Sequence, residues 1–552
     1  MSRENGQFAL RGLVPTVLGT LASRGLGLAR DIATAALLGL GQAGIMDALV
    51  IAFRIPNLFR RLLGEGALAT SYLPVLTGEL ERDRTAAWQL TSALLVTLTL
   101  VLTLLVIVGE ILCAAVAICW GPASGAAQLA GLTAAMLPYL VFVCIAAQLS
   151  ATLQALGNFN VPAIMPIVLN VCWLAGVLLV APHFESAAGR AYVVAGCVLV
   201  AGVLQVLVQL RALVKLGFRF RFQWAAVATP LKRIGTATGI VSVGLAVTQI
   251  NTLLDSVLAW TLSAPPGSSR HIIAWLPGQL SYPMQSGAAA AIYYGERFYQ
   301  LPVGLIGMGV ATVAYPLLSR HAAGRDRRAL SADLTASLRL VLFATIPASV
   351  GLVLLAHPLV QVLFERGAFT AEDTARAARM IACYASAAWA YCAMPVLVRA
   401  FYALGDQGRP VRAALYAMVL DLVLNLTLVW PLAEAGLAVS TALVAIAQLG
   451  WLAVVFSRAH VSLAWREMGT TVLKSAAAAA MMGLVLWAAT AVMPSDNRPV
   501  EAVWLAGLCG AGALIYIATA WSLGSAEVAW LAGRKRESAF VPPGDLSAKL
   551  AS

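Results

Sequence analysis

The chain has 552 residues, of which 60% are hydrophobic and only 11% are charged, and its formal net charge is +12. Soluble proteins carry about 25% charged residues, and the mean hydropathy here is +0.84, so the composition excludes a water-soluble globule. The basic excess does not indicate nucleic-acid binding, because the Lys and Arg residues mostly form short clusters beside apolar runs, where membrane topology and anionic lipid headgroups explain them.

Apolar runs of about 20 residues recur along the whole chain, and each is long enough to cross ~30 Å of hydrocarbon as a helix. The period-2 alternation of a membrane barrel is absent. We therefore predict an all-α polytopic membrane protein with about 14 transmembrane helices. Their predicted centres lie near residues 25, 60, 102, 140, 172, 202, 247, 303, 348, 390, 420, 447, 482 and 511.

The basic clusters predict the orientation of these helices. The richest clusters, at 211–233, 320–328 and 534–536, all fall on one side when alternate loops are assigned to opposite sides. Because cytoplasmic loops carry the excess of Lys and Arg, this side is predicted to be the cytoplasm, and both termini lie there.

A short internal repeat predicts the domain organisation. The sequence Ala-Leu-Gly at 155–157, followed by Pro162, recurs at 403–405, followed by Pro410. Two parallel six-helix repeats with substrate bound between them would explain it, whereas chance turn chemistry is the alternative. The predicted parts are an N-terminal half (1–214), a cytoplasmic linker (215–231), a C-terminal half (232–458), two extra helices (459–524) and a cytoplasmic tail (525–552).

The first span carries three charges, Arg24, Arg30 and Asp31. Each costs about 2.5–3.5 kcal/mol at the centre of a membrane helix, so these side chains must face protein or water. At about 100° per residue, Arg24 and Asp31 lie on nearly the same face, and Arg30 points about 120° away.

Two other spans continue this theme. The second carries Arg54, Arg60 and Arg61, with Glu65 four residues after Arg61, and the eighth carries Arg297. Arginine grips phosphate oxygens in bidentate fashion, so a diphosphate fits a chamber lined by such groups. The alternative is that the arginines pair with nearby carboxylates and only lock helices together.

A second constellation concerns energy coupling. Asp255, Asp421, Asn425 and Thr441 supply oxygen ligands from three predicted spans, and Asp421 and Asn425 share one helix face. Such a set suits Na⁺ or a shared proton as the coupling ion, with hydrogen bonding across the bundle as the alternative. We expect no other cofactor and no enzymatic activity, because the five histidines are scattered without metal-ligand spacing.

Several ordered motifs resemble the MurJ (MviN) family of lipid II flippases. They are SRGLGLARD (23–31), Asp47 after a Gly-rich turn, RIPNLFRRLLGEGA (54–67), YYGERFYQLPVGLIG (293–307), LFERGAFTAEDT (363–374) and RAFYALGDQGRPVRAA (399–414). They extend over essentially the whole chain.

The resemblance implies alternating access around a cationic cavity in a bacterial inner-membrane protein. The family's cavity arginines fall on Arg24, Arg30, Arg60 and Arg297, and its acidic gate residue falls on Asp47. To these we add Asp31 and Asn57 as substrate contacts and Glu65 and Glu296 as gate residues. The implied partners are lipid II, membrane lipids and wall-synthesis or division machinery. A groove for the polyprenyl tail is implied near 470–524, and the protein is expected to be a monomer.

The chain also departs from the family pattern. Gln300 stands where many members carry an acid, and an insertion at 264–285 precedes the eighth span. Other functions stay open: a flippase for O-antigen or capsule lipids would also move a diphosphate-linked glycan. A drug or cation antiporter is disfavoured by the intramembrane arginines, and a purely structural scaffold would not need them.

Overall fold

The computed structural model describes residues 3–41, 44–62, 67–121, 124–265, 272–273, 280–494 and 497–531. The structure is 86% helical, which confirms the predicted all-α membrane class. In the described ranges, ten helical segments are long and apolar enough to cross a membrane, or 11 if the bent pair Ala371–Ala385 and Ala388–Ala403 forms one span. The count of fourteen stays a prediction.

Two long helices show why a hydropathy criterion finds fewer membrane-crossing segments than the fourteen predicted from the sequence. α1 (Arg3–Leu38) and α9 (Trp224–Thr261) have 36 and 38 residues, yet neither is among the apolar segments. In α1 the apolar pattern is interrupted by Arg24, Arg30 and Asp31. Near the predicted span centre at residue 60, α2 ends at Phe59, π-helical residues follow at 60–62, and α3 begins at Ala67, while residues 63–66 lie outside the described part of the chain.

Packing divides the chain into two units. Unit 1 comprises Met1–Ala290 and Arg366–Asp373, and unit 2 comprises Ala291–Glu365 and Thr374–Ser552. The boundary at Ala290 falls within α10 (Ala288–Pro302), so the start of this helix belongs to unit 1. The predicted halves, which were defined by repetition, stay a prediction.

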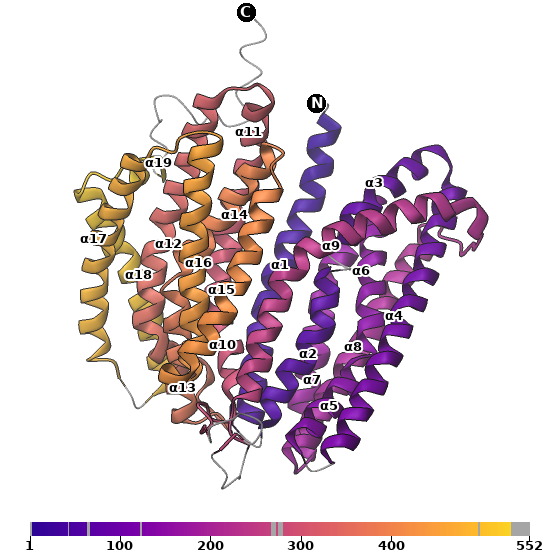
Figure 1. The fold of residues 1–552 in the computed structure, drawn as a ribbon, viewed down its shortest axis with the longest axis horizontal. Helices are drawn as coiled ribbons and strands as arrows, with labels where there is room; N and C mark the ends of the chain where they lie inside the picture. Colours follow the sequence, from indigo (N-terminus) through magenta and orange to yellow (C-terminus); the bar gives the residue numbers. More distant parts are fainter. Residues whose placement is uncertain are drawn as a thin grey trace, which may run out of the picture. The chain divides into compact units, whose positions relative to one another are not determined.

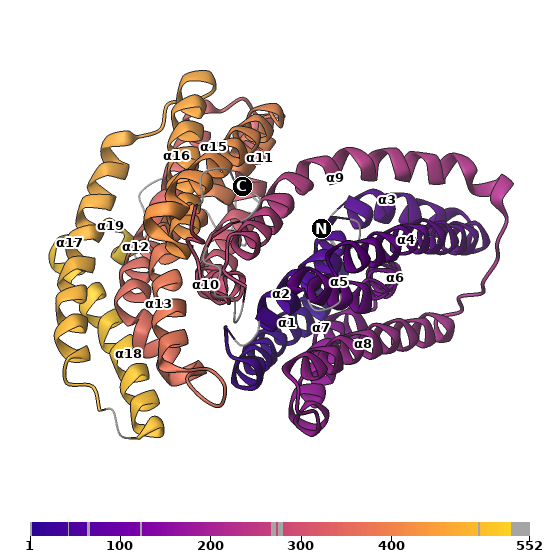
Figure 2. The same cartoon turned by 60° about the horizontal axis from the view of Figure 1, so that its bottom comes forward.

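In unit 1, α1 packs along α7, and α6 packs on α8 (Figure 1, Figure 2). The Asp83 side chain caps α4 by accepting the N–H groups of Thr85 and Ala86 at 2.8 and 3.2 Å. The remaining helices of this unit are α2 (Ile45–Phe59), α3 (Ala67–Arg82), α4 (Arg84–Trp120), α5 (Gly125–Met136), α6 (Tyr139–Ala155), α7 (Asn160–Ala175) and α8 (Ala187–Lys215). A π-helical segment (Gly176–Val180) and a 3-10 turn (Ala181–His183) follow α7.

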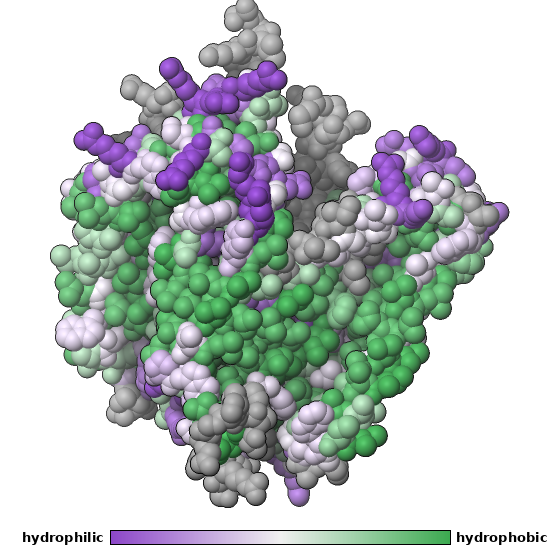
Figure 3. Space-filling view, viewed as in Figure 1, coloured by the Kyte–Doolittle hydropathy of each residue, from purple (hydrophilic) through white to green (hydrophobic). Residues whose placement is uncertain are grey.

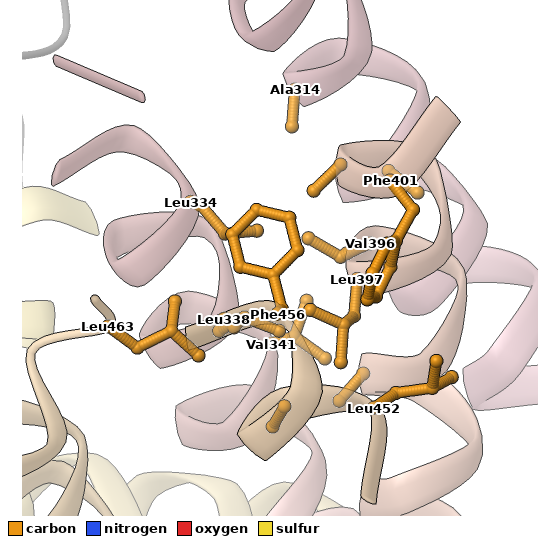
Figure 4. Close-up of a cluster of buried hydrophobic side chains, with 14 of the residues drawn as sticks. Ala314, Leu334, Leu338, Val341, Val396, Leu397, Phe401, Leu452, Phe456 and Leu463 are labelled. Atoms are coloured by element: carbon orange, nitrogen blue, oxygen red, sulfur yellow. The ribbon is translucent and has the colours of Figure 1, made fainter. Parts of the chain in front are cut away.

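Unit 2 is built on α12, which packs against both α14 and α17. Its core is apolar, with Phe401 and Phe456 in edge-to-face contact beside Leu334 and Leu338 (Figure 4). A π-helical segment (Val303–Gly307) follows α10. The other helices are α11 (Met308–Ala323), α12 (Arg327–Phe364), α13 (Ala371–Ala385), α14 (Ala388–Ala403), α15 (Gly408–Leu432), α16 (Glu434–Ala459), α17 (Trp465–Thr490), α18 (Arg498–Ser522) and α19 (Ala526–Leu531).

An ionic network centred on the buried Arg339 and Glu527 attaches the short helix α19 to this unit. Arg339 on α12 donates to Glu527 on α19 at 2.8 Å and to Glu467 on α17 at 2.5 Å. Thr471 donates to the same Glu527 carboxylate at 2.6 Å, and the Trp530 ring lies 4.9 Å from the guanidinium. Three helices that are far apart in sequence are therefore joined at one point.

The two copies of the Ala-Leu-Gly repeat adopt the same turn. Gly157 after α6 has a φ of 78°, and Gly405 after α14 has a φ of 74°. In both copies the next residue donates back across the turn, from Asn158 to the Leu153 carbonyl at 2.9 Å and from Asp406 to the Phe401 carbonyl at 3.0 Å. Glycine is suited to these positions because it adopts a positive φ without steric cost.

The insertion at 264–285 folds back on itself. Ser263 forms a bridge with Met284, and Ile272 forms one with Ser281. Pro266, Arg270 and His271 lie outside the described residues. Elsewhere, the surface shows an apolar band across the helices with hydrophilic residues gathered at helix ends (Figure 3), as a bilayer requires.

Candidate functional site

Arg30 is the centre of a buried polar cluster in unit 1. Its guanidinium donates to the Asp31 carboxylate from Nε at 3.0 Å and from Nη2 at 2.7 Å. Nη1 donates to Asn170 Oδ1 at 3.2 Å, and the Trp173 ring centroid lies 4.6 Å away. Arg30 is only 5% exposed and Asp31 only 6%, so the two charges compensate each other inside the protein.

Asn170 and Trp173, both on α7, were not predicted from the sequence. Asn170 also donates to the Ser23 carbonyl at 3.0 Å, and the Trp173 indole donates to Thr34 at 3.0 Å. These bonds tie α7 to three successive turns of α1. The signal that would have identified Asn170 is a lone amide inside an otherwise apolar membrane helix, which calls for a polar partner.

Arg24 contrasts with Arg30. It is exposed, and in the described part of the chain no carboxylate lies within ion-pair distance of it. Arg24 and Asp31 were predicted to share a face, but the carboxylate of Asp31 is bound by its sequence neighbour Arg30. Of Arg24 and Arg30, Arg24 is therefore the one with an uncompensated guanidinium.

The arginines of α2 contact different partners. Arg60 donates from Nε and Nη2 to Asn57 Oδ1 at 3.0 and 2.8 Å, so the two predicted substrate contacts lie together. Arg54 donates to the Thr252 carbonyl at 2.8 Å, and Arg61 donates to Gln249 at 3.3 Å. Both bonds reach α9, which supports a structural role for these two residues. Glu65 lies outside the described residues.

Asp47, in the first turn of α2, caps the start of α10. Its carboxylate accepts the backbone N–H groups of Gly287 at 2.7 Å and Ala290 at 2.8 Å. The side chain is buried, with 1% exposure. A carboxylate at this position satisfies N–H groups that have no partner within the helix and interacts favourably with the helix dipole. Asp47 thus holds the beginning of the helix that carries Arg297.

Three glycines with positive φ lie near this cap, at the end of α1. Gly39 approaches the Ala368 carbonyl, Gly367 approaches the Ala36 carbonyl, and Gly287 approaches the Leu40 carbonyl. A Cβ atom at these positions would lie 2.6, 2.3 and 2.7 Å from the respective oxygens. The main chain of Ala368 also donates to Ala36 at 2.7 Å. The segment Arg366–Asp373 is therefore joined to α1 by direct backbone contact.

Replacing Asp47 with alanine is expected to weaken this junction by about 1–3 kcal/mol, because two buried N–H groups lose their acceptor. Hydrogen exchange of the first turn of α10 should rise in the Asp47→Ala protein. Asp47→Asn, which keeps one acceptor oxygen, should give an intermediate rate. Equal protection in all three proteins would contradict a capping role.

Unit 2 carries the remaining predicted arginine. Arg297 donates to the Tyr293 hydroxyl, and its guanidinium lies 4.7 Å from the centroid of the same ring. Glu296 is buried, with 7% exposure, whereas Gln300 is exposed. The π-helical segment that begins at Val303 follows within two turns. Such segments are frequent at functional sites.

Part of the predicted cation site lies on α15 and α16. Asn425 donates to Asp421 Oδ2 at 3.2 Å, as their spacing predicts, and Ser440 donates to Asp421 Oδ1 at 2.9 Å. Ser440 was not predicted: its neighbour Thr441 was, but the Thr441 hydroxyl donates to the Leu437 carbonyl. Asp255 is buried in α9 of unit 1.

The oxygen-only donor set of Asp421, Asn425 and Ser440 fits a hard monovalent cation better than a transition metal. All three residues are at most 2% exposed. No group of three or more His, Cys, Asp or Glu side chains within the described ranges is arranged to hold a metal ion.

Comparisons with known proteins agree on one family. The sequence model of the family described as "Lipid II flippase MurJ" matches residues 34–505. A "Probable lipid II flippase MurJ" from Vibrio cholerae is 32% identical over 92% of this chain and 94% of its own length. A "Lipid II flippase MurJ" from Burkholderia cenocepacia is 31% identical over 76% of this chain and 78% of its own length.

Solved structures show the same fold. A lipid II flippase MurJ in an inward closed conformation superposes with a TM-score of 0.70 at 22% identity, covering 92% of this chain and 98% of that one. An inward-facing multidrug resistance MATE family transporter gives a TM-score of 0.60 at 11% identity, covering 78% of this chain and 94% of that one. With a family model that matches most of its length, this multi-pass membrane protein belongs to the lipid II flippase MurJ family.

Proposed function

We propose that this protein moves lipid II, an undecaprenyl-diphosphate-linked peptidoglycan precursor, from the inner to the outer leaflet of the bacterial cytoplasmic membrane. Family membership over residues 34–505 is the observation that carries the proposal. Both termini lie in the cytoplasm, as the basic loops indicate. The protein works as a monomer and as a transporter, breaking no covalent bond, and wall-synthesis enzymes use the lipid that it delivers.

The diphosphate is bound by Arg24 of α1, and Arg297 of α10 stays a predicted substrate contact. Arg24 supports this role because its guanidinium is exposed and uncompensated, and an arginine in that condition binds phosphate oxygens strongly. Arg30 has a positioning role, since its charge is already matched by Asp31. The contact of its guanidinium with the Trp173 ring holds α1 against α7. Arg60, held by Asn57, contributes a further positive group, and Asp47, Glu65 and Glu296 act at the gates.

The direct test is transport of lipid II in vesicles that contain the purified protein. Labelled lipid II is placed in both leaflets, and an external hydrolase that cannot cross the membrane cleaves the outer pool. Full cleavage with protein, against cleavage of about half without it, is the result that supports flipping. If only about half of the labelled lipid II is cleaved although the folded protein is present in the vesicle membrane, lipid II is rejected as the substrate. An O-antigen precursor would then be assayed in the same way.

Arg24→Ala is expected to slow this transport by about 10- to 100-fold, since it removes one charge-assisted phosphate contact worth about 1.5–3 kcal/mol. Its thermal stability should be unchanged, because the exposed guanidinium makes no ion pair in the described structure. Arg211→Ala, an exposed arginine at the end of α8, is the matched control and should transport normally. Normal transport by Arg24→Ala would remove Arg24 from the proposed site.

We further propose that Na⁺ or a proton resets the cycle at Asp421, Asn425 and Ser440 of unit 2, where Thr441 is the other predicted ligand. In Asp421→Asn the carboxylate charge is lost, and a cation gradient should no longer increase the transport rate. Thr427→Val, which removes an exposed hydroxyl on the same helix, should leave the response intact. A wild-type rate that is independent of both Na⁺ and proton gradients would eliminate the coupling site.

A further inference from the structure

A cavity of about 510 Å³ lies in unit 2, where the start of α12 meets the junction between α16 and α17. Arg327, Arg328, Ser331 and Thr335 line it from α12, and Ser462 and Glu467 line it from the other side. Neither the sequence motifs nor the proposed transport cycle uses these residues.

The cavity carries uncompensated positive charge. Arg327 and Arg328 occupy the first turn of α12 and are both exposed. Among the described residues neither guanidinium takes part in an ion pair. Two adjacent arginines in this condition repel each other, and an anion bound between them would relieve the repulsion.

The acidic groups around the cavity are already engaged. Glu467 accepts a hydrogen bond from Arg339 at 2.5 Å. Asp406 lies 2.9 Å from the Nε2 atom of His460, which also lines the cavity. These pairings leave Arg327 and Arg328 as the charges that face an incoming ligand.

The position along α17 places the cavity at the depth of lipid headgroups. Glu467 is in the first turn of α17, whereas Val472 and Leu473 are 40% and 72% exposed and begin the apolar, lipid-facing surface. Leu473 follows Glu467 by six positions, which along a helix is a rise of about 9 Å. This distance is comparable with the ~5–8 Å thickness of one headgroup layer. Trp465 is 47% exposed beside the cavity, and tryptophan is typical of this interface.

The surface view agrees with this placement. Hydrophilic residues gather at the end of the bundle where α11 and α12 meet, and an apolar band follows below them (Figure 3). Basic loops near the membrane attract anionic lipid, at about 1 kcal/mol for each Lys or Arg. The loop at 320–328 is one of the three basic clusters that the positive-inside rule assigns to the cytoplasm.

We propose that this cavity is a binding site for the phosphate group of an anionic phospholipid, held by Arg327 and Arg328. The acyl chains of the bound lipid lie along the exposed apolar face of α17. The site is separate from the proposed transport of lipid II and does not depend on it.

The test compares R327Q/R328Q with the control R211Q/K215Q. The control also removes two positive charges, but from exposed residues near the end of α8. Each purified full-length protein is titrated with phosphatidylglycerol in detergent, and bound lipid is counted by native mass spectrometry. Binding to R327Q/R328Q should be roughly 10- to 30-fold weaker than to wild type, because two charge-assisted contacts with the lipid phosphate in the cavity are lost. The control pair should change it by less than about threefold, as expected of screened surface charges.

A second arm distinguishes the source of the phosphate. Inorganic phosphate replaces the lipid, and the thermal midpoint is recorded for the same variants. The proposal expects stabilisation by phosphatidylglycerol, none by phosphatidylcholine, and little by millimolar phosphate. Stabilisation by inorganic phosphate alone, dependent on Arg327 and Arg328, would reassign the site to a soluble anion. Equal loss of lipid binding in both double variants would overturn the site altogether.

Discussion

Arg30→Ala is expected to destabilise the protein by about 3–5 kcal/mol and to abolish transport. The substitution leaves Asp31 buried without the guanidinium that now lies 2.7 Å from it, and breaking a buried ion pair from one side carries this cost. The contacts with Asn170 and Trp173 are lost in the same step. Thermal unfolding followed by circular dichroism measures the loss.

The double variant Arg30→Ala/Asp31→Ala provides the control. Removing both charges leaves no isolated carboxylate, so most of the lost stability should return, while transport stays impaired if α1 needs its contact with α7. An Arg30→Ala protein as stable as wild type would show that Asp31 is solvated and that the pair does not fix α1. Together with Arg24→Ala, the two variants separate loss of substrate contact from loss of structure.

Arg339→Ala is expected to cost a similar 3–5 kcal/mol, because Glu527 is 1% exposed and would lose its cationic partner. Unfolding in detergent, followed by circular dichroism, measures it. Deleting the chain from Glu527 onward should cost less than Arg339→Ala, since Arg339 keeps Glu467 as a partner.

The same network predicts a dependence on pH. Burial raises the pKa of Glu527, but hydrogen bonds from Ser525 and Thr471 and the charge of Arg339 outweigh it, so the pKa is lowered. A carboxyl group with a lowered pKa in the folded state adds stability above its usual pKa of about 4.5, and this stability is lost as the pH falls through the folded value. Wild type should therefore lose more stability than Glu527→Gln between about pH 5 and pH 3.

The sequence showed which helices carry charged residues, but it was less reliable for the directions in which their side chains extend. Helical periodicity placed Arg24 and Asp31 on one face, yet a long arginine side chain reaches its neighbour, and Arg30 binds Asp31. The angular argument treats every side chain as a radial vector, which fails for flexible residues.

Side-chain partners that are far apart in the sequence could not be predicted from local sequence patterns. Asn170 is 140 positions from Arg30, and nothing in the periodicity of either span connects them. By contrast, Asp421 and Asn425 contact each other because they are one turn apart. The family motif predicted Asp47 as a gate residue and did not reveal that its carboxylate accepts backbone N–H groups at the start of α10. At the second predicted span, α2 ends at Phe59 and α3 begins at Ala67. Residues 63–66 lie outside the described part of the chain, so this single span stays a prediction.

The backbone contacts at Gly39, Gly287 and Gly367 have a practical consequence for functional genetics. Because the groups in contact are main-chain carbonyls, they carry no titratable charge and are insensitive to salt. An alanine scan of polar side chains would test this corner only through Asp47 and Asp373 and would miss the contacts between main-chain atoms. Only substitutions that add atoms to the glycines, rather than remove atoms from their neighbours, would reveal how closely the end of α1 is held to Arg366–Asp373.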